Sequence, residues 1–293
     1  MAGAAVKKDG TPDFLVIGHV TLDIVKGGSA PGGAAFYASL AAVRLGRRVG
    51  LVTRGAPQGA LTALEGVEVV NLPSETATVF ENIYKDGKRA QRIHSVAGHI
   101  DGGDVPKAWG GCPVQLIAPV YREVKASLPI GASDSLVGIC PQGWMRERLP
   151  DGRVKPVEWD GGDILRCSHV MALSEEDLVE RVLPKTWHEW PGILIITKGE
   201  QGSVGRWDGR WHRVPAYAAR EVSPTGAGDV FAAAFLVRYS ETRDPAESAL
   251  FAAAAASVKV EHAGVGGIPT RERVQERRAR HPDLRVTPCE KPF

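Results

Sequence analysis

A glycine-rich turn followed by an aspartate is the sharpest chemical feature of the sequence. Residues 223–229 read Ser-Pro-Thr-Gly-Ala-Gly-Asp and lead into an apolar stretch at 232–237, which predicts a helix that begins at the glycines. The first N–H groups of a helix lack partners within it and lie at the positive end of its dipole. The N–H groups of residues 226–228 are therefore expected to bind an anion.

Asp229 is the candidate catalytic group of this turn. Thr225 can serve as the N-cap, so the carboxylate of Asp229 is available to take a proton from an attacking hydroxyl while the N–H groups hold a transferring phosphoryl group. The alternative is that Asp229 only favours the helix dipole in the first turn. The spacing alone leaves both interpretations open.

The elements that must position this turn follow an alternating pattern. Short apolar runs alternate with helix-length segments, which predicts a parallel sheet with crossover helices. Strands are expected at 14–17, 48–53, 114–118, 136–140, 169–173 and 193–197, and helices at 34–45, 227–239 and 245–260. No linker or repeat divides the chain, so we expect one domain over residues 1–293.

Residues 76–96 have a different pattern, with apolar residues at every second position around a turn. The Asp86-Gly87 pair is a strong hairpin signal, and a second turn signal lies at 150–152. A hairpin inside an alternating α/β chain predicts an accessory sheet beside the main one.

Composition excludes several classes of protein. Glycine is abundant, at roughly 12% (34 of 293 residues) against a usual ~7%, so many tight turns or close backbone approaches are expected. A net charge of +2 argues against nucleic-acid binding, and we interpret the arginines at 271, 273, 277, 278 and 280 as one solvated face of a final helix.

The remaining compositional signals concern location. The four cysteines form no CxxC pair, no apolar run reaches the ~18 residues of a membrane span, and the N-terminus has no secretory signal. We therefore expect a cytoplasmic protein with no membrane partner.

Four blocks of the sequence together resemble the ribokinase-like (PfkB) carbohydrate kinase family. Residues 226–231, Gly-Ala-Gly-Asp-x-Phe, resemble the C-terminal signature of that family. Gly32-Gly33 and the alanine-rich helix to Gly46 resemble its first signature, residues 18–23 its opening strand and substrate aspartate, and residues 196–202 its nucleotide loop. The blocks occur in the family order between residue 14 and about residue 267.

The resemblance implies a three-layer α/β/α sandwich with a mostly parallel central sheet and a small β-sheet lid, formed by segments of about 19–31 and 76–97. It implies ATP-dependent phosphorylation of a hydroxyl on a small sugar, polyol or nucleoside. By position it makes Asp229 the catalytic base and the N–H groups of Gly226, Ala227 and Gly228 the anion hole. The implied substrate contacts are Asp23, Gly32 and Gly33. The implied contacts to ATP are Thr197, Gly199, Gly202, Thr225 and Gly264, with residues 254–267 covering the adenine.

Two departures from the family pattern bear on the substrate. Tyr37 occupies a position where the family usually has asparagine; it either stacks on a substrate ring or belongs to the core. Gln142 follows Cys140-Pro141 where many sugar kinases have Asp-Pro-Asn, which would move a substrate contact to Gln142. Arg146 nearby is interpreted as a surface residue, with an anion contact as the alternative.

The segment 174–177, Ser-Glu-Glu-Asp, corresponds to the family's magnesium-linked Asn-x-x-Glu box. Glu176 or Asp177 would act on Mg²⁺ through water. Alternatively, Ser174 and Asp177 form a capping box that starts a helix.

The leading hypothesis is an ATP- and Mg²⁺-dependent kinase of a small sugar or polyol, acting as a monomer or homodimer. Tyr37, Gln142, the Pro-Thr form of the last signature and residues 260–262 are similar to the myo-inositol kinase branch seen in plants. A nucleoside kinase of the same fold is the first alternative. A weakly catalytic ligand-sensing or scaffold member is the second, because Ser223 and Ser174 stand where the family has Asp and Asn.

Overall fold

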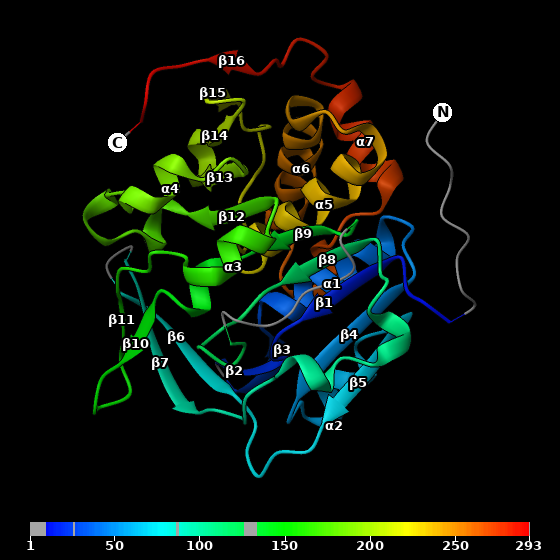
Figure 1. The fold of residues 1–293 in the computed structure, drawn as a ribbon, viewed down its shortest axis with the longest axis vertical. Helices are drawn as coiled ribbons and strands as arrows, with labels where there is room; N and C mark the ends of the chain where they lie inside the picture. The colour runs from blue at the N-terminus through cyan, green and yellow to red at the C-terminus, as the bar shows by residue number, and fades with distance from the viewer. Residues whose placement is uncertain (1–9, 26, 86–87, 126–133, 293) are drawn as a thin grey trace.

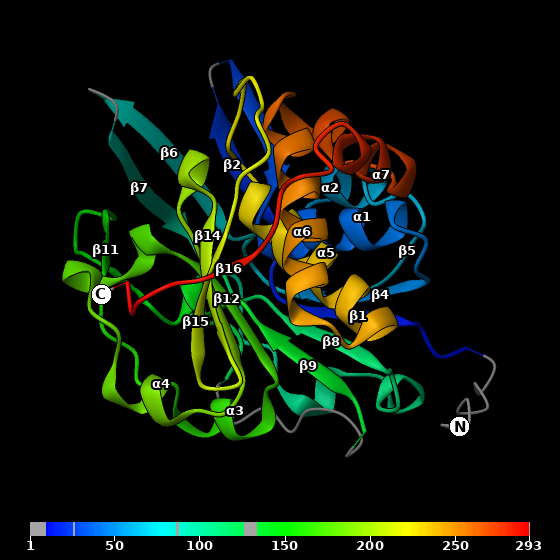
Figure 2. The ribbon, with the colours of Figure 1, turned by 90° about the horizontal axis from the view of Figure 1, so that it is seen from above.

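The computed structural model describes residues 10–25, 27–85, 88–125 and 134–292. The predicted Asp86-Gly87 turn lies outside the described residues. The elements are shown in Figure 1 and, turned by 90°, in Figure 2.

A large sheet runs through the centre of the molecule in the order β16-β15-β14-β13-β12-β9-β8-β1-β4-β5. Its strands are β1 (Phe14–Ile17), β4 (Val49–Arg54), β5 (Val67–Leu72), β8 (Val114–Ile117), β9 (Leu136–Ile139), β12 (Val170–Ser174), β13 (Ile193–Thr197), β14 (Ser203–Trp207), β15 (Arg210–Val214) and β16 (Thr287–Pro288). From β5 to β13 every neighbouring pair is parallel, and β14 to β16 add an antiparallel edge. The predicted mostly parallel sheet is confirmed. Its central strands are apolar because both of their faces are covered.

Helices lie on both faces of this sheet (Figure 2). One layer consists of α1 (Ala34–Arg44), α5 (Ala227–Thr242), α6 (Pro245–Val260) and α7 (Arg271–Ala279), with α2 (Gln58–Thr62) packed against the same core, and the opposite face carries α3 (Gly162–Cys167) and α4 (Lys185–Glu189). Short 3-10 turns are η1 (Gly102–Asp104), η2 (Lys107–Trp109), η3 (Pro141–Gly143), η4 (Glu175–Asp177), η5 (Val179–Arg181), η6 (Gly199–Gln201) and η7 (Gly264–Gly267). Two apolar cores result, one under α1 and α5 and one around Trp187, so the three-layer prediction is confirmed.

Two small sheets lie beside the main one. The first has the order β3-β2-β6-β7 and consists of β2 (Thr21–Val25), β3 (Gly28–Gly32), β6 (Val79–Lys85) and β7 (Lys88–Ser95). The second pairs β10 (Arg146–Arg148) with β11 (Val154–Pro156) around the predicted turn at 150–152. Both segments predicted to form a lid thus contribute strands to one sheet, while its closing function stays a prediction.

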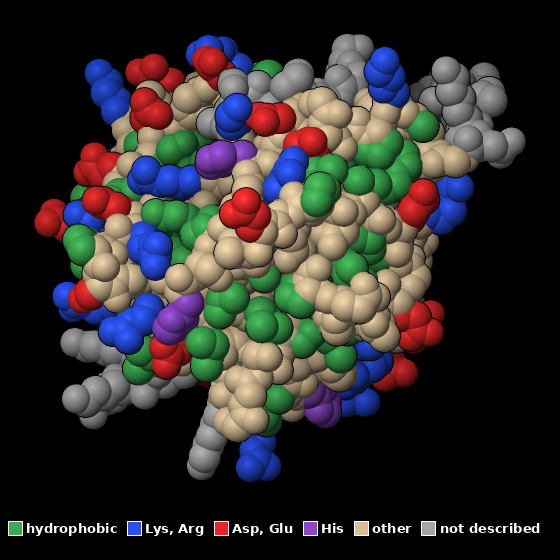
Figure 3. Space-filling model, turned by 90° about the horizontal axis from the view of Figure 1, so that it is seen from below, with side chains coloured by type: hydrophobic (Ala, Val, Ile, Leu, Met, Phe, Trp, Pro, Cys, Tyr) green, Lys and Arg blue, Asp and Glu red, His purple; other side chains and the backbone are tan. Residues whose placement is uncertain are grey.

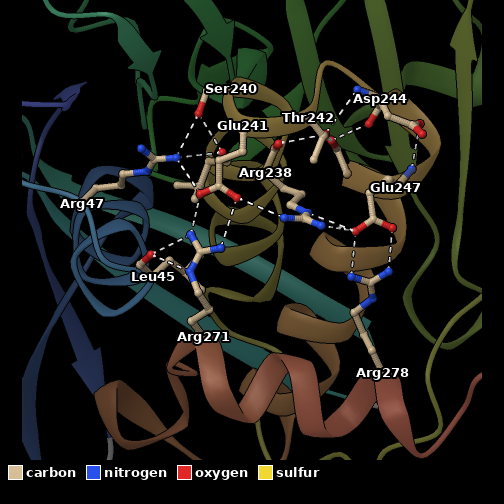
Figure 4. Close-up of polar contacts among 12 residues, drawn as sticks. Leu45, Arg47, Arg238, Ser240, Glu241, Thr242, Asp244, Glu247, Arg271 and Arg278 are labelled. Atoms are coloured by element: carbon tan, nitrogen blue, oxygen red, sulfur yellow. Dashed lines mark hydrogen bonds and ion pairs between the residues drawn. The ribbon is translucent and has the colours of Figure 1, made fainter. Parts of the chain in front are cut away.

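Arg271, Arg277 and Arg278 near the C-terminus are paired with carboxylates, which corrects the sequence interpretation for these three, while Arg280 is exposed. Arg271 forms a two-pronged contact with Glu241 at 2.6 and 3.1 Å, and Arg278 does the same with Glu247 at 2.6 and 2.8 Å (Figure 4). Arg47 and Arg238 also bind these carboxylates, from the end of α1 and from α5. This network joins α7 to α5, α6 and the loop after α1, so the arginines dock the final helix.

We expect the Glu241 and Glu247 network to make the fold sensitive to acid. Burial alone would raise the pKa of each carboxyl, but the hydrogen bonds and charges of the arginines lower both pKa values below the usual 4.5. A depressed pKa in the folded state adds stability that is present above the unfolded pKa and is lost as the pH falls through the folded value. Urea unfolding midpoints should therefore decline from about pH 4.5 downward.

Glu247→Gln isolates this contribution. It leaves Arg278 without its carboxylate and Arg238 with Glu241 alone, so we expect a loss of about 1–2 kcal/mol in unfolding free energy at pH 7 and a shallower decline in acid. Glu147→Gln is the control, because Glu147 pairs with Lys155 on an exposed hairpin and should change stability little. Equal stability of wild type and Glu247→Gln at pH 7 would contradict the assignment.

The surface carries both signs of charge. On the face in Figure 3, Lys and Arg side chains lie among Asp and Glu side chains around an apolar centre. Within the described residues, every helix is too short or too polar to cross a bilayer.

Candidate active site

The predicted site residues follow neighbouring strands at one edge of the main sheet. Gly18, which opens the predicted block 18–23, comes directly after β1, Gln142 after β9, Asp177 after β12 and Gly199 after β13. These four strands are parallel, so their carboxyl ends share one edge, which is where ligands bind in open α/β sheets. The sheet therefore brings segments that are far apart in the sequence to one place.

The turn before α5 is built around Gly226. Gly226 has φ +82° and is itself the cap residue of α5, with no side chain capping the helix. The prediction that Thr225 caps the helix is therefore wrong, because the left-handed glycine takes the cap position. A side chain at Gly226 would also collide with the ring of Tyr37, since a Cβ there would lie 2.5 Å from the ring carbon Cγ.

The N–H groups of this turn are not equally available. Ala227 donates its N–H to the carbonyl of Pro224 at 3.1 Å, so this group is already bonded within the turn. Among the backbone hydrogen bonds of the described residues, none has the N–H group of Gly226 or Gly228 as its donor. The anion-binding role of Gly226, Ala227 and Gly228 stays a prediction.

Asp229 lies in the first turn of α5 and is partly buried. Burial raises the pKa of the Cys140 thiol well above its usual value, and the negative charges of Asp229 and Asp177 raise it further. The charges of both carboxylates therefore raise the pKa of the same thiol, at the end of β9. The structure thus brings Asp229 close to the Gln142 and Asp177 pair.

Asp177 is held by two hydrogen bonds. Its Oδ1 accepts from Gln142 Nε2 at 3.1 Å, and its Oδ2 accepts from the Ser174 N–H at 3.0 Å. The Ser174 hydroxyl accepts from the Glu176 N–H in return, so the capping box predicted from the sequence is present. It starts the short turn η4.

The metal prediction has only partial support from this arrangement. Both carboxylate oxygens of Asp177 already accept hydrogen bonds, whereas the side chain of Glu176 is exposed. In the part of the chain that the structure describes, no three His, Cys, Asp or Glu side chains cluster as a metal site. The described residues therefore do not form a protein cage for Mg²⁺, and a contact of Glu176 or Asp177 to Mg²⁺ through water stays a prediction.

The predicted substrate residues of the small sheet are adjacent. Asp23 on β2 accepts a hydrogen bond from the Thr21 hydroxyl at 2.8 Å. A Cβ at Gly32 would lie 2.5 Å from the Asp23 carboxylate, so a larger residue would displace this side chain. Gly33, with φ +91°, starts α1. Asp23, Gly32 and Gly33 thus come together at the junction of the small sheet and α1.

The nucleotide residues follow β13 and α6. The Thr197 hydroxyl donates to the Leu173 carbonyl at 3.3 Å, and Lys198 pairs with Glu175 at 3.5 Å. Gly199 and Gly264 have φ +56° and +59°, with open space where a Cβ would stand. The structure places these loops at the same sheet edge and at the end of α6, while their contacts to ATP stay predictions.

The end of α6 also holds the segment that leads into the Gly226 turn. The N–H groups of Val222 and Ser223 both donate to the Val260 carbonyl, at 2.7 and 3.0 Å. Any change at the end of α6 would therefore act directly on the turn.

The side chains of Tyr37 and Arg146 are both buried and already packed against other residues. Tyr37 is 6% exposed, packs edge-on against Phe36 and lies under Gly226, which favours the core interpretation. Arg146 is 7% exposed, donates to the Val120 carbonyl at 2.9 Å and stacks over Phe80. The surface interpretation of Arg146 is wrong, because its guanidinium links the β10 hairpin to the small sheet.

Sequence reasoning missed Lys259. Its side chain is fully buried, and its ammonium lies 5.6 Å from the centre of the Tyr37 ring. It is the only lysine in the apolar, alanine-rich helix 245–260, and a charge in such a segment was the available signal.

Comparison with known proteins agrees with this architecture. The pattern of the pfkB family carbohydrate kinases matches residues 166–271. A cytidine kinase of Thermococcus kodakarensis is 28% identical over 261 residues, which are 79% of this chain and 90% of that protein.

Two solved structures share the fold. A pyrophosphate-dependent kinase in the ribokinase family, complexed with a pyrophosphate analog and myo-inositol, superposes with a TM-score of 0.73 at 24% identity, covering 90% of this chain and 99% of that one. A putative ribokinase II of E. coli in complex with ATP and Mg²⁺ gives a TM-score of 0.66 at 18% identity, covering 92% and 99%.

The family match contains the Gly226 turn and Asp229, and the fold similarity extends over nearly the whole chain. Residues 166–271 therefore carry the pattern of the pfkB family carbohydrate kinases, whose members are phosphotransferases that act on sugar or nucleoside hydroxyls, and the chain has the ribokinase-like fold.

Proposed function

We propose that this chain transfers the γ-phosphoryl group of ATP to a hydroxyl of a small cyclic polyol or sugar, with a myo-inositol-like acceptor favoured. The observation that carries the proposal is the Gly226 turn, where the N–H groups of Gly226 and Gly228 stand at the start of α5 beside the carboxylate of Asp229. Phosphoryl transfer needs positioning and stabilisation of negative charge, and this turn can provide both.

In the proposed mechanism each residue has one task. Asp229 accepts the proton of the acceptor hydroxyl as its oxygen bonds to the γ-phosphorus and the bond to ADP breaks. The N–H groups of Gly226 and Gly228 stabilise the charge on the transferred group. Mg²⁺, bound by the ATP phosphates, would neutralise part of their charge, with Glu176 as a contact through water.

The acceptor would bind between the small sheet and the end of β9. Asp23 and the backbone at Gly32 offer polar contacts on one side. Gln142 donates to Asp177 through Nε2, which leaves its carbonyl oxygen for a hydroxyl of the acceptor. A ring with many hydroxyls suits these contacts, and the structural relative that holds myo-inositol supports this choice.

A nucleoside kinase is the second candidate, and the cytidine kinase of Thermococcus kodakarensis favours it, because the similarity covers 90% of that protein. The donor also needs a direct test, because one structural relative is described as pyrophosphate-dependent.

A panel of acceptors and donors tests the proposal. Purified protein is given ATP or pyrophosphate, with Mg²⁺, and myo-inositol, ribose, fructose, adenosine or cytidine, and phosphorylated products are identified by ³¹P NMR and mass spectrometry. We expect acceptor-dependent ADP release with ATP, greatest for myo-inositol. Greatest turnover on cytidine or adenosine would favour the nucleoside kinase. Nucleotide binding without turnover on any acceptor would favour the ligand-sensing alternative.

A further inference from the structure

A lysine buried behind the candidate active site has no role in the mechanism above. Lys259 lies in the last turn of α6 and is 0% exposed. A buried ammonium is unfavourable unless other groups compensate for its lost hydration. Its ammonium donates to the His262 carbonyl at 3.3 Å and faces the Tyr37 ring at 5.6 Å.

These contacts hold the ammonium beside the ring that packs against the Gly226 turn. The Tyr37 ring lies so close to Gly226 that a Cβ there would sit 2.5 Å from it. The ammonium of Lys259 therefore lies on the ring whose atoms also support the turn. The next residue, Val260, holds the segment before the turn through two hydrogen bonds. Ammonium, ring and turn thus form one packed unit.

The charge that acts on Lys259 is that of Asp229. Burial lowers the pKa of Lys259, and the carboxylate of Asp229 opposes this by raising it. By reciprocity, the ammonium favours the ionised form of Asp229. Among the described residues, the charge of Asp229 also acts on the Cys140 thiol at the end of β9, on which the charge of Asp177 in η4 acts as well.

We propose that Lys259 is a positioning residue for phosphoryl transfer, which keeps Asp229 ionised before the reaction and adds positive charge behind the anion-binding turn. The proposal rests on the proposed kinase function of Asp229. Lys259 keeps its proton throughout, since the proton of the acceptor passes to Asp229 and the broken bond leaves its electrons on ADP. Lys259 acts through Asp229 and the turn, so it touches neither substrate.

The test compares Lys259→Met, which keeps the length of the side chain and removes its charge, with Lys259→Arg and wild type. Lys259→Gln is the second neutral variant, since its amide can still donate to the His262 carbonyl. Lys155→Met is the matched control, because Lys155 lies on an exposed hairpin. Profiles of kcat and kcat/KM are measured from pH 5 to 9, with thermal unfolding to confirm that each variant folds.

We expect the acidic limb of kcat/KM to move to higher pH by about one unit in the neutral variants. The plateau kcat should fall about tenfold, less than for loss of a direct donor, because Lys259 acts from behind the turn. The acceptor KM should stay unchanged. Lys259→Arg should return the acidic limb of the kcat/KM profile to its wild-type position, and Lys155→Met should match wild type.

Folded neutral variants with the wild-type acidic limb would overturn the role of Lys259, and so would an arginine variant that behaves like Lys259→Met. If Asp229→Asn is inactive while the acidic limbs of the neutral Lys259 variants match wild type, the proposed role of Lys259 is wrong and the proposed kinase function stands. If Asp229→Asn keeps full turnover, the proposed function fails as well.

Discussion

Replacing Asp229 with asparagine is expected to lower kcat by roughly 10²–10⁴, the range for loss of a general base. Asparagine has nearly the same shape, so the acceptor and ATP should still bind and their KM values should change little. Folding should still occur, although the variant loses about 0.3–1 kcal/mol through the dipole of α5 and also the charge that opposes the burial of Lys259. Steady-state ADP release on the best acceptor measures the effect.

Glu272→Gln is the control for this experiment. Glu272 also lies in the first turn of a helix, α7, and is exposed. It should lose the same small dipole contribution while keeping wild-type kcat. Near wild-type turnover of Asp229→Asn would show that Asp229 is only a helix-dipole residue, which is the alternative that the spacing left open.

The elements that hold the site could be predicted because local pattern and tertiary role agree in them. β1 and β13 are continuous apolar runs, and a strand buried on both faces needs such a run. The end of α6 was predicted at Val260 and is found there. The glycines of the Gly226 turn were noticed for the same reason, because backbone that approaches a ligand or a ring leaves no room for a side chain.

The residues that the sequence misplaced are all charged or capping groups whose partners lie far away in the chain. Arg146 is buried because it meets Val120 and Phe80, and Arg278 is docked because it meets Glu247. Lys259 reaches Tyr37, which is more than two hundred residues earlier. A single sequence gives no pairing information of this kind, so an isolated arginine or lysine reads as a surface residue.

The cap of α5 shows a different limit. Thr225 is a good N-cap by composition, yet the helix starts one residue later at Gly226. The left-handed φ of Gly226 directs the turn over Tyr37, and that geometry follows from the packing of α1 under α5 rather than from the cap preference of threonine.

Gly226→Ala is expected to be the most damaging small substitution in the backbone of the site. Alanine at φ +82° costs roughly 1–2 kcal/mol, and its Cβ would lie 2.5 Å from the Tyr37 ring, so the turn or the ring must move. Movement of the turn would re-aim the N–H groups of Gly226 and Gly228. We therefore expect kcat to fall by about 10²–10³, as for loss of an anion-hole donor.

Gly209→Ala separates strain from misplacement of the donors. Gly209 also has a left-handed φ, +71°, but no atom lies within 4 Å of a Cβ there, and it sits in the turn between β14 and β15. It should lose a similar 1–2 kcal/mol in urea unfolding and keep its kcat. If Gly226→Ala loses stability to the same extent but also keeps its kcat, the N–H groups of the turn do not stabilise the transferred phosphoryl group. The loss of kcat at Gly226 alone would instead tie catalysis to the position of this turn over Tyr37.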